Sequence, residues 1–429
     1  MIRMKLHWQV LVALVLAVLA GSATQMDSLV AGISPLAIYD FLGSLFLNAL
    51  KMLIVPLIVA SIIAGLANNR TTAGLGRLGG KTLAWYLTTT TLAVLVGLLA
   101  VNLVQPGLVD GQPARDSLGL AAETGAVMEK VAGRGSGELV EILLRMVPPN
   151  IVSAAAEGQM LGLITFSLLF GYFVTYLPEE LGRSQRSFWE GFAQVMLKIT
   201  ELVMKFAPLG VFGLVAKVVA TSGLESFHPL VGFFFTVLAA LAIHMFVVLP
   251  LLLKFVGQVS PLRHFQAMSP ALLTAFSTAS SSATLPLTMD CVEKRAGVSE
   301  HTSSFVLPLG ATVNMDGTAL YECAAVLFIA QAYGVDLGFM QQLTVVILAL
   351  LTSIGVAGIP AASLVAITLI LTHFGLPAEA IGLILATDRL LDMCRTSVNV
   401  FSDACGAVAI ARTEGETPLS GGRSGETSQ

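Results

Sequence analysis

Apolar runs long enough to cross a bilayer alternate with short polar segments through the first 255 residues. A spanning helix needs about 20 mostly apolar residues. Basic residues gather in alternate connecting segments, which is typical of loops that stay on the cytoplasmic side. The pattern therefore predicts six spanning helices, at about residues 1–25, 41–67, 83–104, 160–176, 188–221 and 230–255.

Prolines and polar segments refine this prediction. Pro148 and Pro149 break the chain before the fourth helix, so we expect that region to be in pieces. The basic residues 178–186 are predicted to form a cytoplasmic loop, and Pro208 predicts a kink in the fifth helix. The polar, glycine-rich residues 105–145 are predicted to form an external connection.

The N-terminal segment has two interpretations. Arg3 and Lys5 precede its apolar run and small residues follow it, as in a secretory signal peptide. The alternative is a first spanning helix with a cytoplasmic N-terminus. This second interpretation fits residues 21–40, which contain no Lys or Arg, as expected for an outside loop.

Two later segments, Pro270–Asp290 and Leu350–Leu371, have apolar ends around a centre of small residues. Arg263 precedes the first and Lys294 follows it, which predicts that both of its ends are cytoplasmic. The second has no basic flank and is predicted to enter from the outside. Two opposed re-entrant hairpins, each followed by a spanning helix, form the inverted repeat that many transporters use. Two ordinary kinked crossings are the alternative.

Between these hairpins, the apolar segment Phe305–Ala332 contains three weak helix formers, Asn314, Asp316 and Gly317. We expect the helix to unwind there and to present carbonyl and carboxylate oxygens. Such ligands suit a hard cation such as Na⁺.

Glu322 lies one turn beyond Thr318, near the middle of the same segment. An ionisable side chain this deep in a membrane is a candidate functional group, because only its neutral form tolerates the interior well. A hydrogen-bonded structural acid is the alternative.

Residues 381–411 carry a polar stripe within an apolar helix. Its members are spaced 4, 3, 4 and 4 residues apart and share one helix face: Asp388, Asp392, Arg395, Asn399 and Asp403. Charges at the bilayer centre are costly, so the stripe must face protein or an aqueous cavity. Three carboxylates against one arginine indicate that a cation from solution binds here, although buried structural ion pairs are an alternative.

Composition agrees with an integral membrane protein. Hydrophobic residues make up 55% of the chain and charged residues 12%, whereas soluble proteins have about 25% charged residues. The helical spacing of the polar residues excludes a transmembrane barrel. The net charge of -4 gives no sign of a nucleic-acid partner.

No enzyme chemistry stands out in the sequence. It has no zinc signature, no phosphate-binding loop and no Ser-His-Asp set, so an enzyme is not expected. The cysteines lie in apolar segments without paired spacing and are interpreted as core thiols: Cys291, Cys323, Cys394 and Cys405.

Four ordered motifs make nearly the whole chain similar to one family. The dicarboxylate/amino acid:cation symporter family, which includes archaeal aspartate transporters and mammalian excitatory amino-acid transporters, has motifs that resemble SSSATLP (280–286), NMDGTALYE (314–322), SIGVAGIP (353–360) and DMCRTSVNVFSD (392–403). The resemblance implies an all-α integral membrane protein with eight transmembrane helices and two opposed hairpins. It also implies a homotrimer in which a transport domain moves like an elevator against a trimerisation scaffold.

Carried over to this chain, the scaffold would comprise residues 1–70 and 106–221, the latter including the external loop. The transport domain would comprise residues 80–105 and 225–412. Residues 413–429, rich in Gly, Ser, Thr and Glu, are predicted to be disordered.

The resemblance also implies a substrate site. Asp392 would hold the substrate ammonium, Arg395 its side-chain carboxylate, and Asn399 with the hairpin-tip backbone its α-carboxylate. The full set of substrate residues carried over is Ser281, Thr318, Gly358, Asp392, Arg395, Thr396 and Asn399.

Up to three coupled Na⁺ ions are implied in the same way. Their ligands would be Gly310, Asn314, Asn399 and Asp403 for one ion, Thr312, Ser353, Ile354 and Val356 for a second, and Tyr86, Thr89, Thr90, Asn314 and Asp316 for a third. Some relatives have Thr where this chain has Val356, a small departure if that ligand is a backbone carbonyl. Proton-coupled mammalian relatives have Glu where archaeal ones have Gln at position 322, which makes Glu322 the candidate for H⁺ coupling.

One departure concerns an arginine. Archaeal relatives carry it at the position of Ala279 and mammalian ones at the position of Met393, and this chain has neither. Arg389, one turn away, is a candidate for the missing charge beside an acid such as Glu322 or Asp388.

The function implied is secondary active symport of aspartate or glutamate with Na⁺, with H⁺ as a further candidate. The location implied is the plasma membrane, the inner membrane in a prokaryote, with both termini cytoplasmic. The expected partners are the substrate, lipid and two further copies of the chain. Symport of C4 dicarboxylates or neutral amino acids, or a channel-like pore, are the alternatives.

Overall fold

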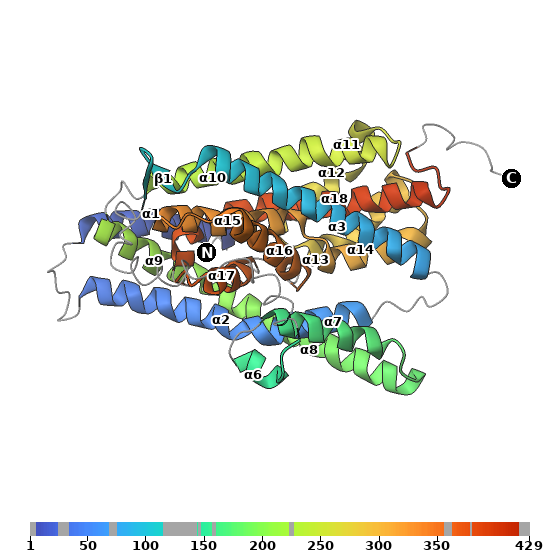
Figure 1. Cartoon of the computed structure of the whole chain (residues 1–429), viewed down its shortest axis with the longest axis horizontal. Coiled ribbons are helices and arrows are strands. Elements are labelled where there is room, and N and C mark those ends of the chain that lie inside the picture. The colour runs from blue at the N-terminus through green and yellow to red at the C-terminus, as the bar shows by residue number, and fades with distance from the viewer. Residues whose placement is uncertain are drawn as a thin grey trace, which may run out of the picture.

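The computed structural model describes residues 6–24, 34–67, 75–114, 144, 147–156, 160–222, 227–355, 363–377 and 380–419. Most of the predicted external connection, the tip of the second hairpin with Val356 and Gly358, and residues 420–429 lie outside these ranges. Nearly all described residues are helical (Figure 1). The described strands are two short ones of two residues each, which pair as a ribbon.

One group of helices packs around α2 (Pro35–Ala67). It comprises α1 (Leu6–Ala23), α7 (Met160–Val174), α8 (Glu179–Lys205) and α9 (Ala207–Ser222), with α1 lying along α9 and α2 contacting α7, α8 and α9. In Figure 1, α2, α7 and α8 run along the lower edge of the molecule, and the short α6 (Ile151–Ala156) packs on α7.

A second group packs around two long buried helices, α15 (Asp316–Tyr333) and α18 (Ile381–Thr413). Its other members are α3 (Leu75–Val104), α10 (Phe227–Ile243), α11 (Leu249–Phe255), α12 (Pro261–Thr278), α13 (Ser281–Asp290), α14 (Glu300–Val313), α16 (Phe339–Gly355) and α17 (Ser363–His373). Figure 1 shows α10 and α11 on the opposite edge from α2, with α3 running obliquely from that edge toward the middle of the molecule. Every residue of α15 except Gln331 is buried, including the polar residues Asp316, Thr318 and Glu322.

Two pairs of helices lie where the two hairpins are predicted. α12 packs against α13, and α16 packs against α17. The first pair turns at Ala279, whose φ of 51° ends α12 in the left-handed conformation, and Ser280 caps α13 by accepting a hydrogen bond from the Ala283 backbone N–H at 3.2 Å.

Three described helices are long and apolar enough to cross a membrane: Arg77–Val104, Pro229–Phe255 and the bent stretch Glu300–Tyr333. α8 and α9 together pass the same test but are bent by 51°. The bend falls at Phe206, so Pro208 lies in the first turn of α9, where a proline is tolerated. The fifth predicted span is therefore two helices rather than one kinked helix.

One local prediction was wrong. Residues 179–186 belong to α8, where Glu179 and Glu180 in the first turn and Lys205 in the last complement the helix dipole. The charges that suggested a loop are instead the polar face of a helix. Residues 105–114 contain a β-ribbon, β1 (Leu108–Val109) paired with β2 (Gln112–Pro113).

The first residues of the segment predicted to be disordered are held against the second group. Glu414 accepts hydrogen bonds from Lys81 at 2.6 Å and from Arg77, both in α3. Glu416 accepts from Ser299 and Thr302 at the start of α14. Residues 413–419 therefore connect the ends of three helices.

Candidate functional site

The helix break predicted between Asn314 and Gly317 is confirmed. α14 ends at Val313, and Asn314 and Met315 have φ, ψ values of -105°, 89° and -118°, 63°, before α15 begins at Asp316. Asn314 and Asp316 are fully buried at this break. Two opposed helix ends and their polar side chains therefore meet inside the second helix group.

Oxygen atoms converge on Asp316 from two other helices. The Thr89 and Thr90 hydroxyls of α3 donate to its Oδ1 at 3.2 Å and 2.8 Å. Ser402 of α18 donates to its Oδ2 at 2.6 Å. The same threonines lie 3.3 Å and 3.2 Å from Asn314 Oδ1. Thr89 also donates to the Tyr86 carbonyl at 3.3 Å, so all five residues of the predicted third cation set are in contact.

Asp403 joins this cluster from α18. It accepts a hydrogen bond from Asn314 Nδ2 at 2.9 Å and packs against Gly310, where an added Cβ would lie 2.5 Å from its Oδ1. The same Cβ would lie 2.7 Å from the hydroxyl of Tyr86, which donates to the Val306 carbonyl at 2.6 Å. Gly310 is therefore needed for the close approach of these oxygens.

Such a set of carboxylate, amide, hydroxyl and carbonyl oxygens suits a hard monovalent cation rather than a transition metal. Among the described residues, no three His, Cys, Asp or Glu side chains come together as a metal cluster.

A second cluster lies nearer the N-terminal half of α18. Arg395 donates from Nη2 to Asp388 Oδ1 at 3.0 Å and to Asp392 Oδ1 at 2.9 Å. Its Cζ lies 3.8 Å from the centroid of the Tyr321 ring, a cation–π contact. Nε and Nη1 of Arg395 have no hydrogen-bond partner among the described residues, although the side chain is only 1% exposed.

Asn399 links α18 to the start of α15. Its Oδ1 accepts from the Gly317 backbone N–H at 2.8 Å, and its Nδ2 donates to Thr318 Oγ1 at 3.1 Å. An added Cβ at Gly317 would lie 2.6 Å from the Arg395 carbonyl, so the two helices touch here. On α18, Asn399 therefore lies between Arg395 and Ser402, which bonds to Asp316, and it bonds to the helix break itself.

Glu322 lies on α15 with no exposed surface. Its Oε2 accepts a hydrogen bond from Thr352 of α16 at 2.7 Å, while its Oε1 has no partner among the described residues. The first arm of the second hairpin is thus bonded directly to this acid. Arg389 faces Asp392, with 3.6 Å between its Nη1 and Asp392 Oδ2, rather than Glu322 or Asp388.

The other predicted site residues are less closely joined. Ser281 is buried at the start of α13, and Thr396 donates to the Asp392 carbonyl at 2.8 Å. In the second predicted cation set, the Thr312 and Ser353 hydroxyls donate to carbonyls of their own helices, although α14 and α16 pack together. Val356, Gly358 and the side chain of Ile354 lie outside the described residues.

Sequence reasoning missed two members of the Asp316 cluster. His244 Nε2 lies 3.0 Å from Asp316 Oδ2, on a π-helical stretch, His244–Val248, between α10 and α11. Ser402 donates to the same oxygen. A lone histidine inside an apolar span is an available signal for the first. Ser402 adjoins Asp403 and has no signal of its own.

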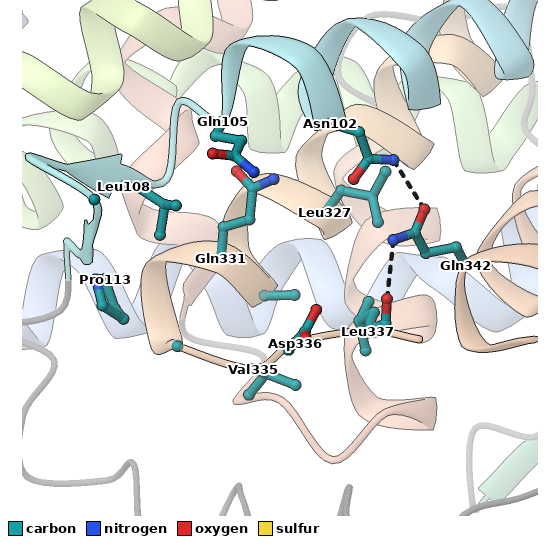
Figure 2. Close-up of a pocket in the computed structure, with 13 residues that line it drawn as sticks. Asn102, Gln105, Leu108, Pro113, Leu327, Gln331, Val335, Asp336, Leu337 and Gln342 are labelled. Carbon is teal, nitrogen blue, oxygen red and sulfur yellow. Dashed lines mark hydrogen bonds between the residues drawn. The ribbon is translucent and has the colours of Figure 1, made fainter. Parts of the chain in front are cut away.

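A separate hollow of about 270 Å³ lies near the β-ribbon (Figure 2). Asn102 of α3 donates to Gln342 Oε1 at 2.8 Å, and Gln342 Nε2 donates to the Leu337 carbonyl at 2.9 Å. Gln342 belongs to α16, so this hollow adjoins the base of the second hairpin. None of the predicted site residues lines it.

Comparison with known proteins finds similarity over nearly the whole chain. A family model described as the sodium:dicarboxylate symporter family matches residues 6–413. A proton/sodium-glutamate symport protein of Bacillus caldotenax is 34% identical over 96% of this chain and 95% of its own length. The proton/glutamate-aspartate symporter of Escherichia coli (strain K12) is 35% identical over 96% and 94%. Excitatory amino acid transporter 3 of Mus musculus is 35% identical over 93% and 84%.

Proposed function

The chain belongs to the sodium:dicarboxylate symporter family, and from this premise we propose that it couples Na⁺, and H⁺ through Glu322, to the uptake of aspartate or glutamate. It is a multi-pass membrane transporter of this family. The substrate, the ions and the roles of individual residues are the content of the proposal.

The buried guanidinium of Arg395 carries the proposal for an acidic substrate. Two of its nitrogens have no hydrogen-bond partner among the described residues, and a buried unpaired donor is costly. A carboxylate is the natural acceptor, because charge-assisted hydrogen bonds to guanidinium are about twice as strong as neutral ones. Arg395 therefore binds the substrate side-chain carboxylate, and Asp392 binds the ammonium.

The α-carboxylate is held by Asn399 together with backbone N–H groups at the tips of the two hairpins. Asn399 Nδ2 points to Thr318, which places both residues within reach of one ligand. Ser281 at the start of α13 adds backbone N–H groups at a helix N-terminus, where anions are stabilised.

Na⁺ binds at the oxygens around Asn314, Asp316 and Asp403. The Asp316 cluster shares Asn314 with Asp403, and Asn399 bonds to the residue that follows Asp316. Cation and substrate sites thus share one helix break, so binding of either ligand stabilises the conformation needed by the other.

Transport follows from movement of one helix group against the other. The group around α15 and α18 contains every predicted substrate and ion residue that the structure describes, so it acts as the transport domain. The group around α2 acts as the scaffold and forms the contacts of a homotrimer in the plasma membrane, with both termini cytoplasmic.

A channel is the second candidate, because cation oxygens at membrane depth would serve a pore as well. Active transport and passive flow are separated by uptake of radiolabelled aspartate into proteoliposomes with imposed Na⁺, H⁺ and K⁺ gradients. We expect aspartate to accumulate above its external concentration only when an inward Na⁺ gradient is imposed, with an added effect of external acid. Uptake that stops at equal concentrations would contradict symport.

A further inference from the structure

Arg389 is a second arginine of α18 beside the proposed substrate site. Its side chain is 13% exposed, and its Nε and Nη1 atoms are buried without a hydrogen-bond partner among the described residues. A guanidinium stays charged in a protein, so burying it without good hydrogen bonds is costly. The neighbouring charge must explain why it lies there.

Asp392 is that neighbouring charge. Its Oδ1 accepts from Arg395 Nη2 at 2.9 Å, whereas its Oδ2 faces Arg389 Nη1 at 3.6 Å. The first contact is a hydrogen bond and the second is an ion pair too long to be one. Asp392 therefore forms a hydrogen bond with Arg395 and lies at ion-pair distance from Arg389.

Charge balance assigns a role to the long contact between Arg389 and Asp392. From Asp388 to Arg395, the helix carries two carboxylates and two guanidiniums, so the stretch is neutral without any ligand. The ammonium of an amino acid needs the same Asp392 carboxylate. Arg389 and the ammonium therefore compete, and the long, partly exposed arginine side chain can withdraw when the ammonium arrives.

We propose that Arg389 is a positioning residue that replaces the substrate ammonium on Asp392 whenever the transport domain carries no amino acid. This inference rests on the proposed function. After release, Arg389 neutralises the Asp392 oxygen that the ammonium has left. The stretch from Asp388 to Arg395 is then neutral while the unloaded transport domain recrosses the membrane, and no other cation is recruited at this position.

The replacement has two opposite effects on measurable quantities. Competition from Arg389 weakens substrate binding, because the ammonium must displace it. Neutralisation by Arg389 speeds the return of the unloaded domain, which net uptake requires and which exchange of internal for external aspartate does not. A merely structural arginine would affect net uptake and exchange alike.

The test compares the parent with Arg389→Gln and Arg389→Lys in proteoliposomes. For each protein, net uptake into vesicles without aspartate and exchange into aspartate-loaded vesicles are measured, together with the aspartate Kd in detergent. Arg183→Gln is the matched control, because Arg183 pairs only with Glu179 on exposed α8 among the described contacts.

We expect Arg389→Gln to lower the ratio of net uptake to exchange by about tenfold or more, because the stretch from Asp388 to Arg395 is left with one uncompensated negative charge when no ammonium is bound. The Kd for aspartate should fall in the same variant, and Arg389→Lys should restore the ratio. Arg183→Gln should match the parent.

An unchanged ratio in Arg389→Gln, or a ratio that Arg389→Lys fails to restore, would contradict this inference while leaving the proposed function intact. A parent that accumulates no aspartate would contradict the proposed function and this inference with it. The aspartate Kd distinguishes a folded Arg389→Gln protein from an unfolded one, since only a folded protein binds with higher affinity than the parent.

Discussion

The Arg395 guanidinium combines three contacts that hold it in one orientation: Asp388, Asp392 and the Tyr321 ring. A desolvated cation–π contact contributes about 2 kcal/mol, and the two carboxylates fix the guanidinium plane. The nitrogens left over, Nε and Nη1, are therefore presented at a defined position. Such a fixed fork can distinguish a substrate with a second carboxylate from one without it.

Arg395→Cys should remove this selection. Truncating one partner of a buried charge pair costs about 2–5 kcal/mol, so aspartate transport should fall at least ~30-fold. Neutral amino acids, which need no guanidinium, should gain. Uptake of radiolabelled aspartate and serine by the two proteins tests this, with Arg395→Lys as the variant that keeps the charge without the fork. Parent-like aspartate uptake in Arg395→Cys would show that Arg395 is not the selector.

Glu322 is a second residue whose side chain can be tested singly. Its one described hydrogen bond comes from Thr352 in the hairpin arm α16. Gln has the same shape and can accept that bond but cannot carry a proton. We expect external acid to accelerate net uptake by the parent, and Glu322→Gln to lose this response while keeping exchange. Uptake driven by a proton gradient is the measurement. The same pH response in both proteins would exclude a proton-carrier role for Glu322.

At the scale of elements, the sequence predicted the features that depend on residues adjacent in the chain, such as helix breaks and turns. Asn314, Asp316 and Gly317 favour a break, and the helix breaks there. The turn of the first hairpin likewise falls among its small residues, at Ala279. Contacts between elements were different: His244 and Ser402 reach Asp316 only because α10, α15 and α18 pack together. No spacing in the sequence specifies that packing.

The three elements around Asp316 should act as one cation site. Asp316→Asn keeps the side-chain shape but removes the charge that a cation needs, so both Na⁺ and aspartate should bind more weakly by linkage. Aspartate binding titrated at several Na⁺ concentrations tests this, and the dependence on Na⁺ should flatten in the variant. Asp40→Asn is the control, because Asp40 pairs with Lys217 between α2 and α9. Parent binding independent of Na⁺ would contradict sodium coupling altogether.

Glu414 joins the end of α18 to the start of α3, outside the spanning segments. The hydrogen bond from Lys81, with that from Arg77, holds the pKa of Glu414 below its ordinary value. A lowered pKa in the folded state means that the contact stabilises the fold above the ordinary pKa of about 4.3 and is lost as the pH falls through the lowered value.

Glu414→Gln should therefore lower the Tm slightly at pH 7, and this difference should be smaller at pH 3.5. Scanning fluorimetry of the purified protein at both pH values measures the difference. Glu190→Gln, a change at an exposed position of α8, should have no effect at either pH. An equal Tm difference at both pH values would mean that the Glu414 charge does not stabilise the fold.

At the scale of the molecule, the helices divide by packing rather than by chain order. α3 lies between α2 and α7 in sequence yet packs with α10, α15 and α16 in the second group. Hydrophobicity predicted six spans but not this grouping, because a spanning helix needs apolar residues whichever helices it packs against. The family motifs supplied it, since they lie in the helices that surround the helix break.

A sliding movement between the two groups can be tested by cross-linking them. Gly382 of α18 lies across the boundary from α9, and its Cβ would lie 3.6 Å from Leu214 Cδ2. Gly382→Cys with Leu214→Cys, in a background without the four native cysteines, can be joined by Hg²⁺ and released by excess thiol. If one group must move past the other, the joined protein should bind aspartate but not transport it, and thiol should restore uptake.

Gly43 gives the matched control, because it faces the same Leu214 from α2, within the first group. Joining Gly43→Cys to Leu214→Cys fixes two helices that are proposed to stay together, so uptake should continue. Both pairs modify the same residue of α9, which removes local damage at Leu214 as an explanation. Continued uptake by the joined Gly382 pair would contradict the elevator movement, because the substrate would then cross while the two groups are held in a single arrangement.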